Sequence, residues 1–441
     1  MLQQEPICAL ATASGVGAIG VIRVSGQGTF DVVNRIFKGK DLRNVESHTL
    51  HFGTIRDGDA IVDEVLAAVF KSPKSFTKED TVEISCHGSD YIIRQILKLL
   101  VRAGARLARP GEFTQRAFLN GQFDLVQAEA VADLIAADSA ASHRTALNQL
   151  RGGFSKKLAS LREELIHFAS MVELELDFGE EDVEFADRDD LKRLISRLQT
   201  AIAPLIDSFD FGNALKEGVP VAIIGAPNVG KSTLLNALLN EEKAIVTAIA
   251  GTTRDVIEDV LYLDGIKFRI IDTAGIRETE DVVESIGILR SKQTIEKADI
   301  VLALFDSEQT LTDIAPLADE AKTIWVQNKT DLGETTFSNA HLIRISAQKK
   351  EGLEELKKAI TQRVFNEKKT DTVITNLRHY EHLVKTQQAL HDALNGLDMG
   401  ITGDFLAQDI RVALHHLGEI TGTIVNDDLL ANIFSKFCIG K

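Results

Sequence analysis

The stretch GAPNVGKS at residues 225–232 constrains the fold of this chain more than any other feature of its sequence. It matches the phosphate-binding pattern G-x-x-x-x-G-K-[ST] and stands between an apolar, β-branched run (219–224) and a helical pattern (232–239). Gly225 and Gly230 allow backbone N–H groups to turn around a phosphate at the helix N-terminus. A chance glycine-rich turn would lack this setting. The stretch therefore predicts a strand–loop–helix unit that binds a nucleotide.

Two downstream motifs fit the phosphate and metal side of such a site. The sequence TTRD at 252–255 lies in a Gly/Thr-rich loop, where a threonine hydroxyl completes a Mg²⁺ shell. The sequence DTAG at 272–275 ends the apolar run 268–271, so that its carboxylate can hold a metal-bound water and its glycine N–H a γ-phosphate. In the phosphate loop itself, Lys231 reaches the β- and γ-phosphates and the Ser232 hydroxyl ligates Mg²⁺.

Two more motifs fit the base. NKTD at 328–331 follows the apolar run 324–326, and SAQ at 346–348 follows the run 342–345 and would support the base from its backbone. Asp331 can accept hydrogen bonds from the ring N–H and the exocyclic amine of guanine, a pair that adenine lacks. Five motifs in this order indicate a GTP site. The predicted GTP contacts are Asn228, Val229, Gly230, Lys231, Ser232, Thr233, Thr247, Ala248, Ile249, Ala250, Gly251, Thr252, Thr253, Asp272, Thr273, Ala274, Gly275, Asn328, Lys329, Asp331, Ser346 and Ala347.

Composition bounds the class of protein. At 441 residues the chain is long enough for two or three domains, each with its own core. Its three cysteines, Cys8, Cys86 and Cys438, are far apart and predict neither disulfides nor a zinc site. With no apolar run long enough to span a membrane and no leader pattern, we expect a cytoplasmic protein. The formal net charge of −16 argues against a broad nucleic-acid-binding surface.

The N-terminal part of the chain has a mixed texture. Residues 1–118 combine short β-branched runs (21–24, 67–70 and 81–85) with one helical pattern (91–103), which predicts an α+β domain. Within it, residues 15–20 match G-x-G-x-x-G. A strand pattern follows them instead of the helix that a dinucleotide site requires, so we expect a tight turn or a close approach to a ligand there.

The rest of the chain reads as a helical domain interrupted by an α/β domain. Apolar residues at three- and four-residue steps (Leu125, Ala128, Val131, Leu134 and Ile135) begin a helical part at 119–215, in which the acidic stretch 173–184 is expected to be a solvated loop. Residues 216–367 alternate strands and helices as a doubly wound sheet does. Helical patterns return at 378–397 and 404–420, within 368–441. The predicted fold is therefore multi-domain, with an all-α domain split by an inserted Ras-like P-loop GTPase domain.

Several segments outside the GTPase motifs carry a family resemblance. They are GVIRVSG at 20–26, SFT at 75–77, RPGEF at 109–113, DDLL at 427–430 and the ending FCIGK at 437–441. Together with the motifs above, they make the whole chain resemble the MnmE (TrmE) family of tRNA uridine-modification GTPases. Without this resemblance, the ending would suggest only an ordered tail with a spare thiol, since position 440 is not the aliphatic residue of a prenylation motif.

The resemblance implies a function and partners. Family members work as homodimers that form a heterotetramer with the flavoprotein MnmG (GidA), which carries the FAD, and add a carboxymethylaminomethyl-type group to C5 of the wobble uridine of certain tRNAs. The N-terminal domain, 1–118, would provide dimerisation and bind the one-carbon donor, 5-formyl- or methylene-tetrahydrofolate. The bulk negative charge suggests that the partner supplies much of the tRNA surface.

The resemblance also implies site residues in the terminal parts of the chain. The folate contacts would be Arg23, Glu83, Gln122 and Lys441, of which Gln122 stands where some relatives carry a cation. Glutamate can accept from the N–H edge of a pterin, and a cation can pair with folate carboxylates. Read alone, Arg23 and Glu83 would fit surface residues beside strands equally well. Cys438 is the candidate reactive thiol, which requires a lowered pKa or a nearby base.

In the GTPase domain the resemblance implies a K⁺ ion in place of an arginine finger and a glutamate in place of a water-orienting glutamine. Ile276 follows the DTAG motif, where many GTPases carry a glutamine that orients water. In the family a K⁺ ion neutralises the developing charge, which here implies the ligands Asn228, Thr247, Ile249 and Thr252, with Ser232 and Thr253 on Mg²⁺. Glu284 matches the water-orienting glutamate of the family; the alternative is an exposed acid at a helix start. K⁺-dependent pairing of two GTPase domains would then gate the distant site.

Two other functions remain open on the sequence. A ribosome-assembly or other RNA-associated GTPase would share the five motifs, although it should carry a basic RNA-binding module after them. A folate-binding transferase would use the GTPase only as a structural clamp.

Overall fold

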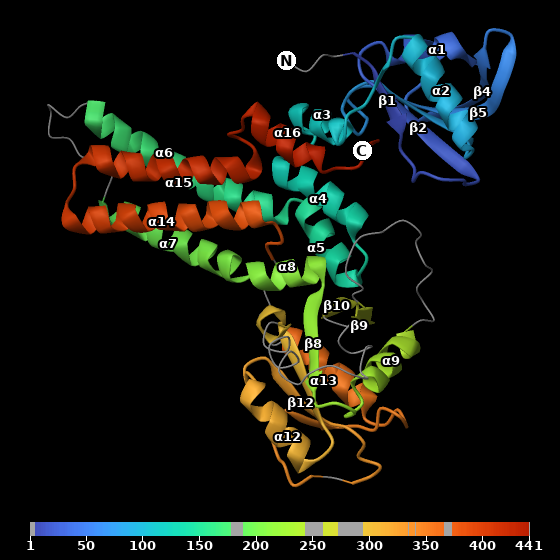
Figure 1. Cartoon of the computed structure of the whole chain (residues 1–441). Helices are drawn as coiled ribbons and strands as arrows, with labels where there is room; N and C mark the ends of the chain where they lie inside the picture. The colour runs from blue at the N-terminus through green and yellow to red at the C-terminus, as the bar shows by residue number, and fades with distance from the viewer. Residues whose placement is uncertain are drawn as a thin grey trace. The chain divides into compact units, whose positions relative to one another are not determined.

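Figure 1 shows the computed structural model of the chain, which describes residues 5–177, 188–242, 259–271, 294–333, 335–339, 341–365 and 373–440. The chain forms two compact units. Unit 1 comprises Met1–Ile135, Gln149–Leu174 and Ile410–Lys441, and unit 2 comprises Ala136–Asn148 and Glu175–Asp409. These units cut across the four-part division expected from the sequence, which stays a prediction.

Unit 1 contains a seven-stranded sheet with the order β3-β4-β5-β6-β2-β1-β7. Its strands are β1 (Ile7–Leu10), β2 (Ile19–Ser25), β3 (Phe37–Lys38), β4 (Thr49–Asp57), β5 (Ala60–Phe70), β6 (Thr81–His87) and β7 (Arg106–Leu107). The three predicted strands fall within β2, β5 and β6. Because β2 directly follows the glycines at 15–18, the dinucleotide reading of that stretch is excluded, as expected.

One face of this sheet is covered by two helices, α1 (Thr29–Ile36) and α2 (Asp90–Arg102) (Figure 1). Alternate residues of β2 and β6, such as Ile22 and Ile84, are fully buried against them. The period of two then places Arg23 and Glu83 on the opposite face, where they are paired in the β2–β6 register. The sheet thus presents two predicted folate contacts side by side.

Besides α1 and α2, the described helices of unit 1 are α3 (Glu112–Leu119), most of α4 (Leu125–Ala136), most of α6 (Gly153–Asp177), the second part of α15 (Gly403–Thr421) and α16 (Asp427–Ser435). Leu125 and Ala128 of α4 pack with Leu430 and Phe434 of α16 in one buried cluster. The sequence analysis did not predict α16 as a helix. Its start is defined by Asn426, whose side chain accepts a hydrogen bond from the Leu429 N–H at 2.7 Å.

The predicted loop at 173–184 is wrong in its first residues. Helix α6 continues through Asp177, whereas 178–184 lie outside the described residues. The helix is held there by burial of Val172 and by the Arg411 Nε–Glu173 Oε1 contact of 2.8 Å. The acidic residues that begin at Glu173 do not end the helix at once, because the apolar Val172 beside them is buried.

Unit 2 contains a six-stranded sheet with the order β13-β12-β11-β8-β10-β9, in which only β9 runs antiparallel to its neighbour. The strands are β8 (Val219–Gly225), β9 (Asp259–Leu263), β10 (Ile266–Ile271), β11 (Ile300–Phe305), β12 (Thr323–Gln327) and β13 (Leu342–Arg344). The four predicted strands correspond to β8, β10, β12 and β13. Their carboxyl ends share one edge of the sheet, which is where ligands bind in this architecture.

The named helices of unit 2 are α5 (Ala140–Leu150, up to Asn148), α7 (Arg188–Asp207), α8 (Phe209–Glu217), α9 (Lys231–Glu242), α12 (Glu308–Ile314), α13 (Leu353–Phe365), α14 (Leu377–Met399) and the first part of α15. The predicted helix 378–397 lies within α14 and the predicted helix 404–420 within α15. None of the described helices combines the length and the hydropathy needed to cross a membrane.

The α/β segment leaves and re-enters the helical part at one place. The backbone N–H of Ile374, after the segment, donates to Ser208 Oγ, before it, at 3.2 Å. The rings of Phe209 and Tyr380 stack with centroids 4.5 Å apart. Adjacent ends are what an inserted domain requires, so the predicted fold class, with a P-loop α/β domain inserted in a helical one, is confirmed.

Candidate functional site

The phosphate loop lies between β8 and α9, as its sequence predicts. Asn228 and Gly230 both adopt the left-handed region, with φ of 62° and 97°. Helix α9 begins at Lys231, so Ser232 and Thr233 occupy its first turn. A loop of this shape at a helix N-terminus directs backbone N–H groups toward an anion.

Lys231 closes this loop on itself. Its Nζ donates to the carbonyl oxygens of Gly225 and Ala226 at 2.8 and 2.9 Å. Burial lowers the pKa of Lys231. The phosphates of a nucleotide would offer this amine stronger acceptors than two neutral carbonyls, because their oxygens are charged. The loop therefore fits a phosphate ligand.

Asn328 joins the predicted base-binding segments to the phosphate loop. It is buried, its Nδ2 donates to the Val229 carbonyl at 2.8 Å, and its Oδ1 accepts from the Ala347 N–H at 3.0 Å. Three of the five motifs, NKTD, SAQ and the phosphate loop, thus meet at one side chain.

Asp331 is held by the neighbouring motif. Ser346 Oγ donates to Asp331 Oδ1 at 2.8 Å, and Lys349 Nζ lies 3.7 Å from Asp331 Oδ2. The Ser346 hydrogen bond, more than the charge of Lys349, lowers the pKa of Asp331. The carboxylate is therefore ionised and accepts hydrogen bonds, as guanine recognition requires. Ser346 acts on it through its side chain, in addition to the backbone role that the sequence predicted.

Sequence analysis missed Asp306, which contacts this site. It follows β11 directly, and its Oδ2 accepts from Lys329 Nζ at 2.7 Å. Lys329 Nζ also donates to the Asn228 carbonyl at 2.7 Å. The only signal in the sequence was an acidic residue at the end of a buried apolar run, on the sheet edge where NKTD also lies.

The remaining predicted GTPase residues lie outside the described part of the chain. They are Thr247, Ala248, Ile249, Ala250, Gly251, Thr252, Thr253, Asp272, Thr273, Ala274, Gly275 and Glu284, together with Ile276. The predicted Thr253 ligand of Mg²⁺, three of the four K⁺ ligands and the water-orienting glutamate therefore stay predictions.

A second polar site lies in unit 1, around Arg23. Its guanidinium makes a two-pronged contact with Glu83 Oε1, from Nε at 2.9 Å and from Nη2 at 2.7 Å. The guanidinium carbon also lies 5.4 Å from the centroid of the Phe76 ring and 5.7 Å from that of Phe113. The side chain is only 16% exposed. A half-enclosed cation and carboxylate beside two aromatic rings fit a flat, polar heterocycle that carries acidic groups.

The C-terminal tail reaches the same guanidinium. Arg23 Nη1 donates to the Gly440 carbonyl at 3.4 Å, and the Gly111 N–H donates to the Cys438 carbonyl at 3.3 Å. Gly440 has a φ of 98°, and a Cβ there would overlap the carbonyl oxygen of Leu10. A glycine is therefore needed for the tail to lie against β1.

Four of the five segments that carried the family resemblance (20–26, 75–77, 109–113 and 437–441) thus contribute residues around Arg23, although they are far apart in sequence. Of the other predicted residues, Cys438 is exposed and Lys441 lies outside the described residues. Gln122 is exposed and its backbone N–H bonds to the Ala117 carbonyl at 2.8 Å. The neighbouring Phe123 packs against Phe76, with ring centroids 5.7 Å apart. The structure brings Arg23 and Glu83 together and does not pair Gln122 with them.

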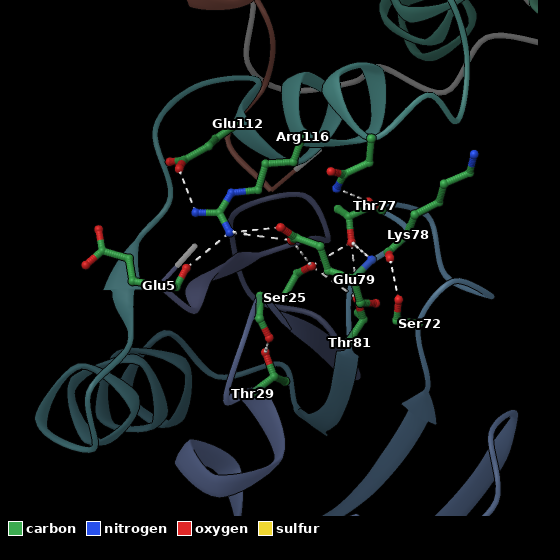
Figure 2. A network of polar contacts seen from close by, with 12 residues as sticks. Glu5, Ser25, Thr29, Ser72, Thr77, Lys78, Glu79, Thr81, Glu112 and Arg116 are labelled. Atoms are coloured by element: carbon green, nitrogen blue, oxygen red, sulfur yellow. Dashed lines mark hydrogen bonds and ion pairs between the residues drawn. The ribbon is translucent and has the colours of Figure 1, made fainter. Parts of the chain in front are cut away.

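Beside this site lies a buried ionic network, of which Figure 2 shows Arg116, Glu112 and Glu79. Arg116 on α3 contacts Glu112 at 3.1 Å and Glu79 at 3.4 Å, and Arg106 contacts Glu112 at 2.6 Å. Burial raises the pKa of Glu112, but the hydrogen bonds from Arg106 and from the Arg109 N–H outweigh it, and the pKa lies below its usual value. Glu79 also accepts from Ser25 Oγ at 2.9 Å. The network ties the loop that carries Phe76 to the helix that carries Phe113.

Family models and named relatives match this chain over nearly its whole length. Residues 6–122 match the family model "GTP-binding protein TrmE N-terminus" and residues 125–438 match "MnmE helical domain". A protein of Cytophaga hutchinsonii called tRNA modification GTPase MnmE is 57% identical over 99% of this chain and 98% of its own length. One of Christiangramia forsetii with the same name is 51% identical over all of both chains. A solved G domain of FeoB from Methanococcus jannaschii aligns at 29% identity over 33% of this chain and 97% of its own, with a TM-score of 0.25.

The two family models together span nearly the whole chain, and the relatives match it from end to end at more than half identity. The chain therefore belongs to the MnmE family of tRNA modification GTPases.

Proposed function

We propose that this chain binds and hydrolyses GTP and that the hydrolysis serves the modification of tRNA. Family membership supports the reaction, and one observation carries the nucleotide assignment. Asn328 bonds both the phosphate loop, through Val229, and the segment whose Ser346 holds Asp331. The phosphate loop and the proposed base-binding segments are thereby joined through one side chain, and the ionised Asp331 can accept hydrogen bonds from guanine.

The substitution Asp331→Asn tests the guanine assignment. An amide nitrogen donates where the carboxylate accepted, so it opposes guanine and suits xanthine, which has a carbonyl at C2. We expect GTP binding to weaken about a hundredfold and XTP binding to strengthen, because a mismatched buried hydrogen bond leaves two polar groups unpaired. Calorimetric titration of the full chain with both nucleotides checks this. The exposed Asp313 on α12 provides the control, and unchanged preference for GTP in Asp331→Asn would refute the assignment.

Two metal ions are proposed at the phosphate side. Ser232 and Thr253 would hold Mg²⁺, which neutralises phosphate charge when bound. Asn228 would hold K⁺ with Thr247, Ile249 and Thr252, since oxygen-only ligands suit a large monovalent cation. The exposed, left-handed Asn228 in the phosphate loop fits this role, because its amide is directed by a backbone that few residues adopt. Glu284 would orient the attacking water. Equal GTPase rates in KCl and NaCl would contradict the K⁺ site.

The second proposal for this chain is a tetrahydrofolate site at Arg23 and Glu83, to which Gln122 and Lys441 would add contacts. The support is the donor set, which combines a carboxylate for the pterin N–H edge, a cation for folate carboxylates and two rings for stacking. Bound folate would supply a one-carbon unit, as 5-formyl- or methylene-tetrahydrofolate, and Cys438 on the tail would be the reactive thiol. We expect 5-formyltetrahydrofolate to bind the full chain and Arg23→Ala to lose that binding while GTP binding is kept. Equal folate binding by the variant would exclude Arg23.

The proposed partners are a second copy of the chain, a flavoprotein of the MnmG (GidA) type that carries FAD, and tRNA. Mass spectrometry of wobble uridines in cells without the protein tests the whole assignment. We expect loss of the carboxymethylaminomethyl-type group at C5. Unchanged tRNA would favour the alternative, a ribosome-assembly or other RNA-associated GTPase.

A further inference from the structure

Asp306 occupies a fixed position beside the nucleotide site without belonging to any of the five motifs. It follows the central, buried strand β11. Its Oδ1 accepts from Thr310 Oγ1 at 3.1 Å, and its Oδ2 accepts from Lys329 Nζ at 2.7 Å. Thr310 is fixed in turn by Ser307, which caps α12. One oxygen of the Asp306 carboxylate thus accepts a hydrogen bond from Thr310 of α12. The other accepts a hydrogen bond from Lys329 in the NKTD segment.

Lys329 connects Asp306 to the phosphate loop. Its Nζ donates to Asp306 and to the Asn228 carbonyl, both at 2.7 Å. Asn228 has a φ of 62°, which costs energy in any residue other than glycine, so the peptide needs support from outside the loop. Lysine has a flexible four-carbon stem with freely rotating donors, and a single neutral carbonyl orients it weakly. A carboxylate at 2.7 Å orients it strongly, because the hydrogen bond is charge-assisted.

We infer that Asp306 is a positioning residue for nucleotide binding: it holds the Lys329 amine against the Asn228 carbonyl and thereby fixes the phosphate loop in its binding conformation. In this role Asp306 acts through Lys329, whose Nζ it holds at 2.7 Å. Hydrogen bonds from Lys329 and from Thr310 lower the pKa of Asp306 more than its burial raises it, which agrees with an ionised partner. The inference rests on the GTP binding proposed above.

A double-mutant cycle on the full chain tests it. We expect Asp306→Ala to weaken GDP and GTP binding about tenfold, the usual effect of losing one charge-assisted hydrogen bond, with KM for GTP rising more than kcat falls. In a Lys329→Ala background the same change should have little further effect, because the residue through which Asp306 acts is gone. Asp313→Ala on α12 is the matched control and should bind as the unchanged chain does, since its carboxylate is exposed and its contact among the described residues is with Gln309, at 3.4 Å.

The other outcomes separate the possible failures. If Asp306→Ala lowers the melting temperature but leaves nucleotide affinity unchanged, Asp306 only supports α12 and the inference is overturned. Additive losses in the double variant overturn it as well. Should Asp306→Ala fail to fold, Asp306→Asn keeps the shape and the Thr310 hydrogen bond while removing the charge, and is expected to weaken binding less than tenfold but measurably. Failure of the unchanged chain to bind GDP or GTP would instead refute the proposed function.

Discussion

Arg116 lies between two carboxylates with only 3% of its side chain exposed. A buried guanidinium is tolerated only when it is paired, and removing one partner leaves an uncompensated charge. Glu112, itself 2% exposed, accepts from Arg116, from Arg106 and from the backbone of Arg109. The Glu112 carboxylate thus bridges two arginines and also accepts a hydrogen bond from the turn that begins α3.

We predict that Glu112→Gln destabilises the chain by about 3 kcal/mol at pH 7, because an amide cannot satisfy the buried Arg116 and Arg106 together. The folded-state pKa of Glu112 lies below its usual 4.5, so its contribution is complete above that pH. The contribution is lost as the pH falls from 4.5 through the folded-state pKa. Urea unfolding at pH 7 and at lower pH should therefore show the difference between the two chains shrinking. A constant difference would contradict the ionic role.

At the residue scale, the sequence predicted the residues that belong to a motif. It did not predict a residue whose role depends on a contact formed in the folded chain. Asn228, Lys231, Asn328 and Asp331 follow from spacing, because a phosphate loop and a base-binding loop need those residue types. Asp306 does not, since its role depends on the contact with Lys329, 23 positions away. No pattern of residue types along the chain encodes that contact.

At the element scale, the hairpin of β9 and β10 packs on the first turn of α5. The Ala141 N–H donates to the Gly265 carbonyl at 3.0 Å, and Lys267 Nζ contacts Asp138 Oδ2 at 2.6 Å. The turn is tight, with Asp264 and Gly265 both in the left-handed region, which fits a two-residue hairpin. Burial, followed by the nearby Asp138, raises the pKa of Tyr262 on the same hairpin. The sequence predicted β10 and a helical part at 119–215, but neither β9 nor this contact across more than 120 positions.

We predict that Gly265→Ala destabilises unit 2 by about 2 kcal/mol. A Cβ there would lie 2.9 Å from the Ala140 Cβ, and the φ of 77° adds backbone strain. Gly58, in the turn between β4 and β5, is the control, because its φ is 62° and nothing lies within 4 Å of a Cβ there. Gly58→Ala therefore measures the strain alone, at about 1 kcal/mol. Urea denaturation measures the loss of unfolding free energy in each variant. Equal losses would mean that the contact with α5 adds nothing to the cost of a Cβ at position 265.

At the scale of the whole molecule, the insertion could be predicted because helical texture stops at 215 and resumes after 367. The contacts that join the two ends of the inserted segment could not be predicted. Ser208 and Ile374 meet through one hydrogen bond, and Phe209 stacks on Tyr380, so the entering and leaving chains support each other. The convergence of the N-terminal sheet, α3 and the tail on Arg23 is of the same kind: the family resemblance identified the segments, and folding made them one site.

This junction predicts that the α/β segment can be removed. Residues 218–366 are replaced with a flexible Gly/Ser linker of about eight residues, and the chains on either side of the deletion keep their contact at Ser208 and Ile374. We expect the shortened chain to unfold cooperatively and to bind 5-formyltetrahydrofolate as the full chain does, since Arg23, Glu83, Phe76 and Phe113 lie wholly outside the removed segment. Binding of GDP and GTP should be lost completely. Circular dichroism during heating and calorimetric titration measure these properties. A shortened chain that folds but no longer binds a folate which the full chain binds would show that the Arg23 site depends on the GTPase segment.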